Sequence, residues 1–474
     1  MTSKLRQLKT GLALSIFCVC LCFQLAAETQ LAGIFANHMV LQRNTEINIW
    51  GTDLPGQSIR IMATWGAGAT AETDPQGNWR LQLSTPEAGG PYTIEIQGSS
   101  NLELSDVLIG EVWLCSGQSN MEMPVKGYRN QPVLGSNEAR LQSIADEIRL
   151  FHFPHNAQLE PKDSIKGRWL VSSPAKVGDF SATAYFFAKK LQEALGVPIG
   201  LVHSSWGGSS AEAWTDRETL LTYDPEIKIP TEMPDRVVFQ APSVLYNGMI
   251  HPLIGYTIRG AIWYQGEANI GRYRTYAQLI TDMVTSWREK WGQGDFPFYF
   301  VQIAPYGYQD GHPTALQREA QAATVDSLPN SGMAVTMDIG DCRNIHPADK
   351  QTVGNRLAYI ALAKTYGING IAYSGPVYRS MEVTEDKKIK VYFDQTENGL
   401  SSFGRELSGF RIAGSDRVFK EAQVRINRDD SITVWSDEVP NPVAVRYAFE
   451  SCSEGTLFNN AQLPASSFRM DSWE

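Results

Sequence analysis

The chain has few cysteines, six among 474 residues, and three of these lie within the first 27 positions. The other three are Cys115, Cys342 and Cys452. Three cysteines are too few for a disulfide framework of the kind that holds small secreted domains together. Their spacing also matches no metal-ligand pattern, so the sequence predicts neither a structural metal nor a cofactor.

The sequence also lacks an excess of positive charge. Lysine and arginine number 41 against 51 aspartate and glutamate residues, which gives a formal net charge of −10. Proteins that bind nucleic acid neutralise its phosphates with a basic patch or stripe, and no such stripe is visible along this chain. Nucleic acid is therefore excluded as the main partner.

Only one apolar segment resembles a targeting or membrane sequence, and it lies at the N-terminus. It covers residues 12–27 and follows three basic residues, Lys4, Arg6 and Lys9. A basic region, an apolar region and small residues at the end are typical of a secretory signal. Residues 1–27 are therefore predicted to be a cleaved signal peptide of a secreted or periplasmic protein without stable membrane insertion. The alternative is an anchoring helix, although the run is shorter than the roughly 20 residues that span a bilayer.

The composition of the whole chain, 43% hydrophobic and 19% charged, is that of a globular protein. Its length predicts two to four domains. Short apolar stretches between turn residues predict an N-terminal β domain over residues 28–105 and a second β unit over residues 375–474. Over residues 106–374, strands alternate with helices, which predicts a parallel sheet with helices on both faces. The predicted core strands are 107–114, 197–203, 256–264, 296–303 and 333–339. The fold class is therefore α/β, with a flavodoxin-like parallel sheet flanked by N- and C-terminal β-sandwich units.

Polar residues follow four of these core strands. The segments are 115–121 (CSGQSNM), 204–209 (SSWGGS), 265–269 (QGEAN) and 340–347 (GDCRNIHP). In open α/β sheets the functional groups gather beyond the carboxyl ends of the strands. A serine, paired glycines, an amide and a histidine are the groups that acyl transfer requires, so the core is predicted to be a hydrolase.

Ser119 is the candidate nucleophile. The alternative is a structural role as a serine that caps a helix. His346 is the candidate general base, because imidazole titrates near pH 6.5 and this residue follows the last strand of the sheet. His203 and His251 lie near other strand or loop boundaries and are its competitors. Cys115 and Cys342 each stand four residues before a candidate catalytic residue, which suggests a bridge between them. The alternative is two buried thiols.

The candidate oxyanion donors are Gly207, Gly208, the side-chain amide of Gln265 and the Ser119 N–H. A base histidine is usually oriented by a carboxylate or a carbonyl group. Asn344 and Asp341 are the possible orienting partners, and the sequence does not choose between them or exclude the neighbouring carboxylates. The candidate substrate-binding residues are Trp206, Glu267 and Arg318, with core packing as the alternative for the tryptophan and a structural role as the alternative for the glutamate.

At these segments the sequence resembles the bacterial sialate O-acetylesterases, within the superfamily of Ser-Gly-Asn-His hydrolases. The residues that carry the resemblance are 117–121, 204–208 with 213–215, 263–267, 341–357, 39–43 and 463–469. The wider superfamily has an asparagine where this chain has Gln265, and an aspartate where it has Arg343. The sialate esterase pattern has an aspartate at the position of Asn344, so the identity of the third catalytic group is in question.

The resemblance implies removal of O-acetyl groups from a sugar, such as 9-O-acetylated sialic acid. It implies Ser119 as nucleophile, His346 as base and no metal. One alternative is an acetylesterase that acts on plant polysaccharide such as xylan or pectin. The other is a carbohydrate-binding protein without catalytic activity.

Overall fold

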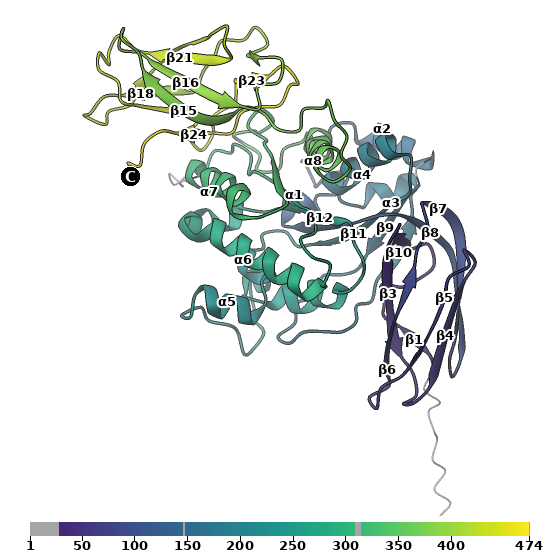
Figure 1. Cartoon of the computed structure of the whole chain (residues 1–474). Helices are drawn as coiled ribbons and strands as arrows, with labels where there is room; N and C mark the ends of the chain where they lie inside the picture. Colours follow the sequence, from purple (N-terminus) through teal and green to yellow (C-terminus); the bar gives the residue numbers. More distant parts are fainter. Residues whose placement is uncertain (1–27, 146, 309–313, 474) are drawn as a thin grey trace, which may run out of the picture.

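The computed structural model describes residues 28–145, 147–308 and 314–473. The predicted signal peptide lies outside the described residues. Figure 1 shows an N-terminal β part and a C-terminal β part at opposite ends of a central α/β part. The mixed α/β architecture predicted from the sequence is therefore confirmed.

The N-terminal part consists of two small sheets whose inward side chains share one hydrophobic cluster. Alternation places Trp79, Leu81 and Leu83 of one strand in this cluster, and Ile59 and Ile61 of the other sheet face them. One sheet contains β1 (Gln30–Leu31), β3 (Glu46–Thr52) and β6 (Asn78–Ser84). The other contains β2 (Val40–Gln42), β4 (Ser58–Ala63), β5 (Gly68–Glu72), β7 (Gly89–Gln97) and the first half of β8 (Asn101–Gly117).

Strand β8 belongs to two parts of the molecule. Its first residues pair antiparallel with β7, and its last residues pair in parallel with β11 and β12 at the centre of the core sheet. The predicted boundary between residues 105 and 106 therefore falls inside a single strand. No flexible linker separates the N-terminal part from the core sheet, because β8 is continuous.

The core sheet has the strand order β10-β9-β11-β8-β12-β13-β14, in which β10 is antiparallel and the others are parallel. Its strands are β9 (Ile148–His152), β10 (Arg168–Val171), β11 (Ile199–Ser205), β12 (Gly260–Tyr264), β13 (Phe298–Val301) and β14 (Ser331–Ala334). Strands β9 and β10 were absent from the sequence prediction. Strand β14 ends at Ala334, earlier than predicted, and residues 335–340 lead into the loop that carries His346.

Helices cover both faces of this sheet, as the alternation of side chains on β12 shows. Ala261 and Trp263 share a hydrophobic cluster with Trp287 of α6, whereas Ile262 and Tyr264 belong to the cluster of α4 and α8. The longer helices are α4 (Ala182–Leu195), α6 (Tyr273–Trp291), α7 (Thr314–Ser327) and α8 (Lys350–Lys364). The shorter ones are α1 (Ser119–Glu122), α2 (Ser136–Gln142), α3 (Pro174–Gly178), α5 (Arg217–Tyr223), η1 (Ser143–Ala145), η2 (Ala211–Trp214), η3 (Val238–Gln240), η4 (Tyr246–Ile250), η5 (His251–Leu253) and η6 (Glu267–Arg272).

The C-terminal part is built from antiparallel strands around a third hydrophobic cluster, which also takes in Val335 and Met337 of the core. One sheet contains β15 (Val377–Val383), β16 (Ile389–Asp394), β21 (Ser431–Trp435) and β20 (Gln423–Ile426). A second contains β19 (Lys420–Glu421), β18 (Phe410–Ala413), β22 (Ala444–Tyr447) and β24 (Phe468–Arg469), and β17 (Leu400–Ser401) pairs with β23 (Phe458–Asn459). The shared cluster joins this part to the α/β core through apolar packing.

A disulfide bond also connects the core to the C-terminal part. It joins Cys342, in the loop of His346, to Cys452. The hypothesis of a bridge between Cys115 and Cys342 is therefore wrong. Cys115 is a free, buried thiol on β8, where it packs in the cluster of α4 and α8. Its side chain is buried because α4 and α8 cover the face of the sheet toward which it points.

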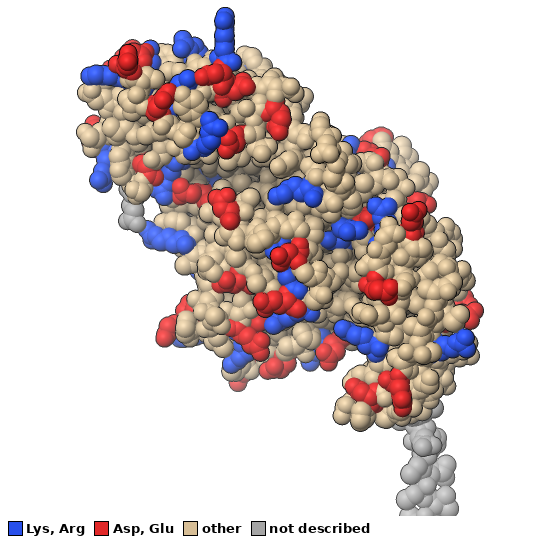
Figure 2. Space-filling view, in the orientation of Figure 1, with Lys and Arg blue, Asp and Glu red and all other residues tan. Residues whose placement is uncertain are grey.

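Charged side chains of both signs are interspersed over the visible face of the molecule, and no basic stripe crosses it (Figure 2). Within the described ranges, no helix combines the length and hydropathy needed to cross a membrane.

Candidate active site

Three of the four polar segments start side by side, because the strands before them end in register. Gly117 of β8 is paired with Ser205 of β11 on one side and with Tyr264 of β12 on the other. The chain therefore leaves the sheet at three adjacent points, at residues 118, 206 and 265. The His346 loop approaches the same edge from beyond β14.

Ser119 is the first residue of α1, directly beyond β8. Gly117 has a φ of +137°, and a Cβ at this position would lie 2.2 Å from the carbonyl oxygen of Tyr264. The turn is held by the Gln118 N–H, which donates to Tyr264, and by the Trp206 N–H, which donates to Gly117. Only glycine permits this turn, which places the Ser119 side chain at the edge of the sheet.

The Ser119 hydroxyl lies 2.8 Å from Nε2 of His346. The other ring nitrogen, Nδ1, lies 2.5 Å from Oε1 of Gln131. Because an amide oxygen can only accept, Nδ1 carries the proton and donates it to Gln131. The lone pair of Nε2 therefore faces the serine hydroxyl, which is the tautomer that a general base requires.

The expected orienting partners do not contact the imidazole ring. Asn344 accepts a hydrogen bond from the backbone N–H of His346 at 3.0 Å, and Asp341 accepts one from the N–H of Arg343 at 2.8 Å. Both side chains stabilise turns of the loop instead. The predicted orienting role of Asn344 or Asp341 is thus corrected to Gln131, which reaches the ring from the loop after α1.

Burial, together with the nearby Lys350 ammonium, lowers the pKa of His346 to about 4. The imidazole is therefore the free base at neutral pH. The two competing histidines lie elsewhere. His203 bonds to Ser205 at 2.6 Å, and His251 contacts the carbonyl oxygen of Lys162 at 3.1 Å.

Gly207 lies against the nucleophile, since a Cβ added to it would be 3.4 Å from Cβ of Ser119. Its N–H donates to the Glu122 carboxylate at 2.6 Å, and His155 holds the other carboxylate oxygen at 2.8 Å. Burial raises the pKa of Glu122, but the bonds from His155 and Gly207 outweigh it and leave the pKa below its usual range. The Gly207 N–H, which the sequence predicts to be an oxyanion donor, is therefore bound to the Glu122 carboxylate.

Trp206 and Gly208 flank this position. The half-buried Trp206 ring stacks on His155, with ring centroids 4.1 Å apart. Gly208 has a φ of +76°, and its carbonyl oxygen accepts from the side chain of Gln240 at 3.1 Å. Gly208 therefore forms the turn, while Gly207 contacts α1 and Trp206 stacks beside it on His155.

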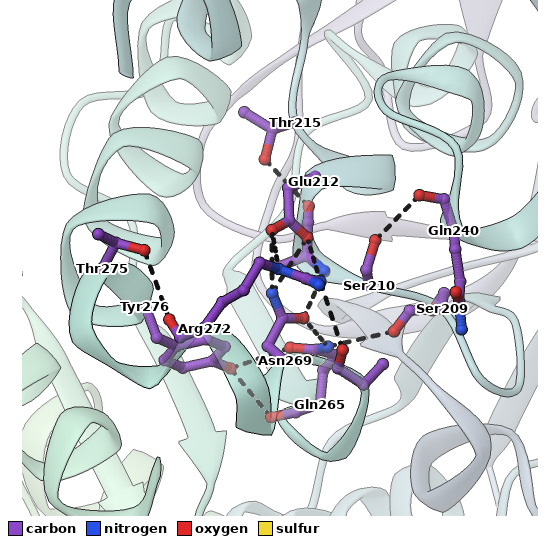
Figure 3. A network of polar contacts seen from close by, with 12 residues as sticks. Ser209, Ser210, Glu212, Thr215, Gln240, Gln265, Asn269, Arg272, Thr275 and Tyr276 are labelled. Carbon is purple, nitrogen blue, oxygen red and sulfur yellow. Dashed lines mark hydrogen bonds and ion pairs between the residues drawn. The ribbon is translucent and has the colours of Figure 1, made fainter. Parts of the chain in front are cut away.

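Gln265 is placed differently from the expectation (Figure 3). Its side-chain N–H groups donate to the carbonyl of Ser209 at 3.1 Å and to Asn269 at 2.7 Å, and its Oε1 accepts from Tyr276 at 3.0 Å. Asn269 in turn donates to Glu212 at 3.0 Å. The Gln265 side chain is fully buried and its hydrogen bonds are satisfied, so the predicted oxyanion donor is a structural residue in this arrangement.

Glu267 and Arg318 also face inward, contrary to their predicted contact with substrate. The Glu267 carboxylate accepts from Asn120 at 2.7 Å, and its second oxygen is enclosed. Arg318 is completely buried and donates to the carbonyls of Ala448 and Glu450 in the C-terminal part. Arg318 is therefore not available to bind a sugar from solvent, and the Glu267 carboxylate is directed to Asn120.

The sequence prediction missed four residues around the site: Glu122, Gln131, Asn120 and Lys350. Glu122 and Asn120 stand beside the nucleophile in chain order, so their position alone could have drawn attention to them. Lys350 stands four residues after His346 in the chain. Gln131 belongs to a loop without any pattern, and no sequence signal marks it. Among the described residues, no group of three or more His, Cys, Asp or Glu side chains is arranged to hold a metal ion.

Comparison with known proteins gives consistent results. The family model for carbohydrate esterases described as sialic acid-specific acetylesterases matches residues 109–363. The mouse sialate O-acetylesterase is 31% identical over 89% of this chain and 89% of its own length. The human sialate O-acetylesterase is 33% identical over 78% of this chain and 77% of its own.

A solved structure is also similar. A carbohydrate acetylesterase from Xanthomonas citri superimposes with a TM-score of 0.86 at 37% identity, covering 94% of this chain and 100% of the other. The similarity therefore extends over the β parts as well as the core.

Gln131→Leu removes the acceptor that fixes the His346 tautomer. We expect kcat for hydrolysis of p-nitrophenyl acetate to fall about tenfold or more, because the imidazole then presents the wrong nitrogen for part of the time. Steady-state kinetics check this. Gln142→Leu, the same change at an exposed position of α2, is the matched control and should retain the parental rate. An unchanged kcat in Gln131→Leu would show that Gln131 does not orient the base.

The depressed pKa of His346 sets the acidic limit of activity. We expect kcat/KM to remain level below pH 6.5 and to fall only as the pH drops through about 4, where the imidazole gains a proton and can no longer accept one. The measurement is kcat/KM against pH, with circular dichroism at each pH to confirm the fold. An acidic limb centred near 6.5 would contradict the effect of burial on this residue.

Proposed function

The chain belongs to the sialic acid-specific acetylesterase family of carbohydrate esterases, and we propose that it removes O-acetyl groups, in particular 9-O-acetyl groups, from sialic acids by a Ser–His mechanism. The observation that carries the mechanism is the line of contacts from Ser119 through His346 to Gln131. This line supplies a nucleophile, a base in the correct tautomer and a group that fixes that tautomer.

In the first half of the reaction His346 accepts the Ser119 proton at Nε2 as the serine oxygen attacks the acetyl carbonyl carbon. The tetrahedral intermediate then collapses. The bond to the sugar oxygen breaks, His346 returns the proton to that oxygen, and the acetyl group remains on Ser119. Gln131 is an uncharged partner, so it holds the imidazolium in place but offers no full countercharge.

The oxyanion needs N–H donors during this step. Ser119 begins α1, and the first N–H groups of a helix have no partner within the helix. Gly207 is the second donor that we propose. Because Glu122 holds the Gly207 N–H, the carboxylate has to withdraw when the acetyl oxygen arrives. Its contact with His155 gives the carboxylate a partner that does not depend on Gly207.

In the second half, water replaces the sugar. His346 takes a proton from this water, and the hydroxide attacks the acetyl-serine. Acetic acid leaves as His346 returns the proton to the Ser119 oxygen, and the acid then loses its own proton to solvent as acetate. The same base thus serves both halves.

Sialic acid carries a carboxylate, so its recognition favours an accessible cation near the nucleophile. Arg343 meets this requirement: it lies three residues before His346, its side chain is 93% exposed, and only a 3.8 Å contact joins it to Asp341. Trp206, beside Gly207, is the aromatic surface that we propose for contact with the sugar. Trp206 thus remains a candidate for substrate binding, and Arg343 replaces Arg318 and Glu267.

We further propose that the protein is exported and that residues 1–27 are removed on export. The disulfide between Cys342 and Cys452 supports this, because disulfides persist mainly in oxidising compartments outside the cytosol. The order β11-β8-β12-β13-β14, with β8 first in the chain, supports the proposal of a flavodoxin-like core. The shared cluster between facing sheets supports a sandwich for the N-terminal part.

Ser119→Ala tests the mechanism. We expect acetate release from 9-O-acetylated sialic acid to fall at least about 1,000-fold, since the attacking oxygen is lost. Acetate is measured enzymatically, and the thermal midpoint confirms that the variant folds. Residual activity close to that of the parent would rule out Ser119 as the nucleophile, and a parent protein that binds sugar without releasing acetate would be a binding protein.

Arg343→Gln tests the substrate class. We expect KM for 9-O-acetylated sialic acid to rise about tenfold, as expected for one lost charge-assisted contact, while KM for neutral acetylated xylan stays the same. Arg428→Gln, at an exposed turn of the C-terminal part, is the control. If acetylated xylan is the better substrate and Arg343→Gln affects both substrates alike, the plant polysaccharide assignment replaces the sialic acid one.

A further inference from the structure

Lys350 is a completely buried lysine that the mechanism above does not use. It is the first residue of α8, where the positive end of the helix dipole opposes a cation. Burial lowers its pKa to about 7, against the opposite effects of Glu267 and Asp349. Burial of a lysine ammonium at this position costs free energy, so the ammonium requires specific polar partners within the protein.

The partner of Lys350 is the side-chain amide of Asn120. The Lys350 ammonium donates to Oδ1 of this amide. The Nδ2 group donates to Glu267 at 2.7 Å and to the carbonyl oxygen of Ile345 at 3.1 Å. The Asn120 residue is fully buried, and its amide uses both donors and its acceptor. One amide thus bridges a buried lysine, a buried carboxylate and the backbone of the histidine loop.

These contacts join chain neighbours of the two catalytic residues. Asn120 directly follows Ser119, and Ile345 directly precedes His346. The Thr183 hydroxyl holds the Asn120 carbonyl at 3.0 Å from the side of α4. The distance between the serine and histidine backbones is therefore fixed through the Asn120 side chain.

We propose that Glu267, Asn120 and Lys350 form a positioning network that holds His346 against Ser119. The proposal rests on the proposed function, because it assigns these residues to the Ser–His reaction. None of the three touches the Ser119 hydroxyl or the imidazole ring in the contacts described, so they act through the two catalytic residues.

Glu267 completes the network electrostatically. Its second carboxylate oxygen has no hydrogen-bond partner among the described residues, and burial raises its pKa. The Lys350 ammonium, which also lies 5.3 Å from the ring centre of Tyr264, favours the ionised carboxylate. Loss of the lysine would leave this carboxylate buried without a countercharge.

The groups that face His346 define a readout specific to positioning and charge. They are Ser119 and Glu122 of α1, Tyr128 and Gln131 of the following loop, and Lys350 of α8. The cation lowers the imidazole pKa and the Glu122 carboxylate raises it. Removing the cation therefore moves the acidic limb of the pH profile to higher pH, an effect that lost stability alone does not produce.

The test is Lys350→Met, which keeps the length of the side chain and removes its charge, assayed in the full-length protein with p-nitrophenyl acetate. We expect kcat to fall about tenfold or more, KM to change less than about twofold, and the acidic limb to move upward by about half a pH unit or more. Lys190→Met on the surface of α4 is the matched control. An unchanged kcat and an unchanged acidic limb would overturn the proposal.

The double variant Glu267→Gln/Lys350→Met separates positioning from folding, also where Lys350→Met alone does not fold. It removes the unpaired carboxylate, so we expect its thermal midpoint to recover toward that of the parent while kcat stays low. Recovery of both the thermal midpoint and kcat would mean a structural role only and would overturn the proposal. Ser119→Ala in the same assay tests the proposed function separately. If Ser119→Ala is inactive and Lys350→Met has the parental kcat and pH profile, the network proposal alone is wrong. If Ser119→Ala is active, the proposed mechanism is wrong.

Discussion

The site depends on the parallel register at the end of β8. Gly117 is paired with Ser205 and Tyr264, so three segments leave the sheet at adjacent positions. A single residue slip in either pairing would reverse the direction of every following side chain, because alternate residues of a strand face opposite sides. The long β8 strand also enters the N-terminal β part, which adds pairing partners to the strand on which the nucleophile depends.

Desolvation determines the chemistry at that edge. Burial keeps His346 uncharged, and its orienting partner is an amide instead of a carboxylate. Serine hydrolases commonly give the imidazolium a countercharge through this partner. Here the Glu122 carboxylate, which faces His346, is directed to Gly207 and His155, and the ionic groups Glu267 and Lys350 contact Asn120 instead of the imidazole. The charged groups therefore surround the Ser119–His346–Gln131 contacts, but none of them is a member of that line.

The C-terminal part contributes to the same edge. Cys452 is bonded to the loop of His346, and buried Arg318 donates to carbonyls of residues 448 and 450. An arginine without these carbonyl partners would be costly at this depth, since its charge cannot be removed at physiological pH. The histidine loop is therefore supported from the core through Asn120 and from the C-terminal part through the disulfide.

The sequence by itself determined the alternation of strands and helices, the β character of both ends and the pairing of Ser119 with His346, because these follow from local periodicity and from the rule that places functional groups at strand ends. It did not determine which side chains meet at the site. Gln131, the group on the imidazole, and Cys452, the partner of Cys342, come from segments without any local pattern. Gln265, Glu267 and Arg318 have the right chemistry for a site but face inward. Only the tertiary structure decides such cases, because burial and hydrogen-bond partners depend on segments far apart in the chain.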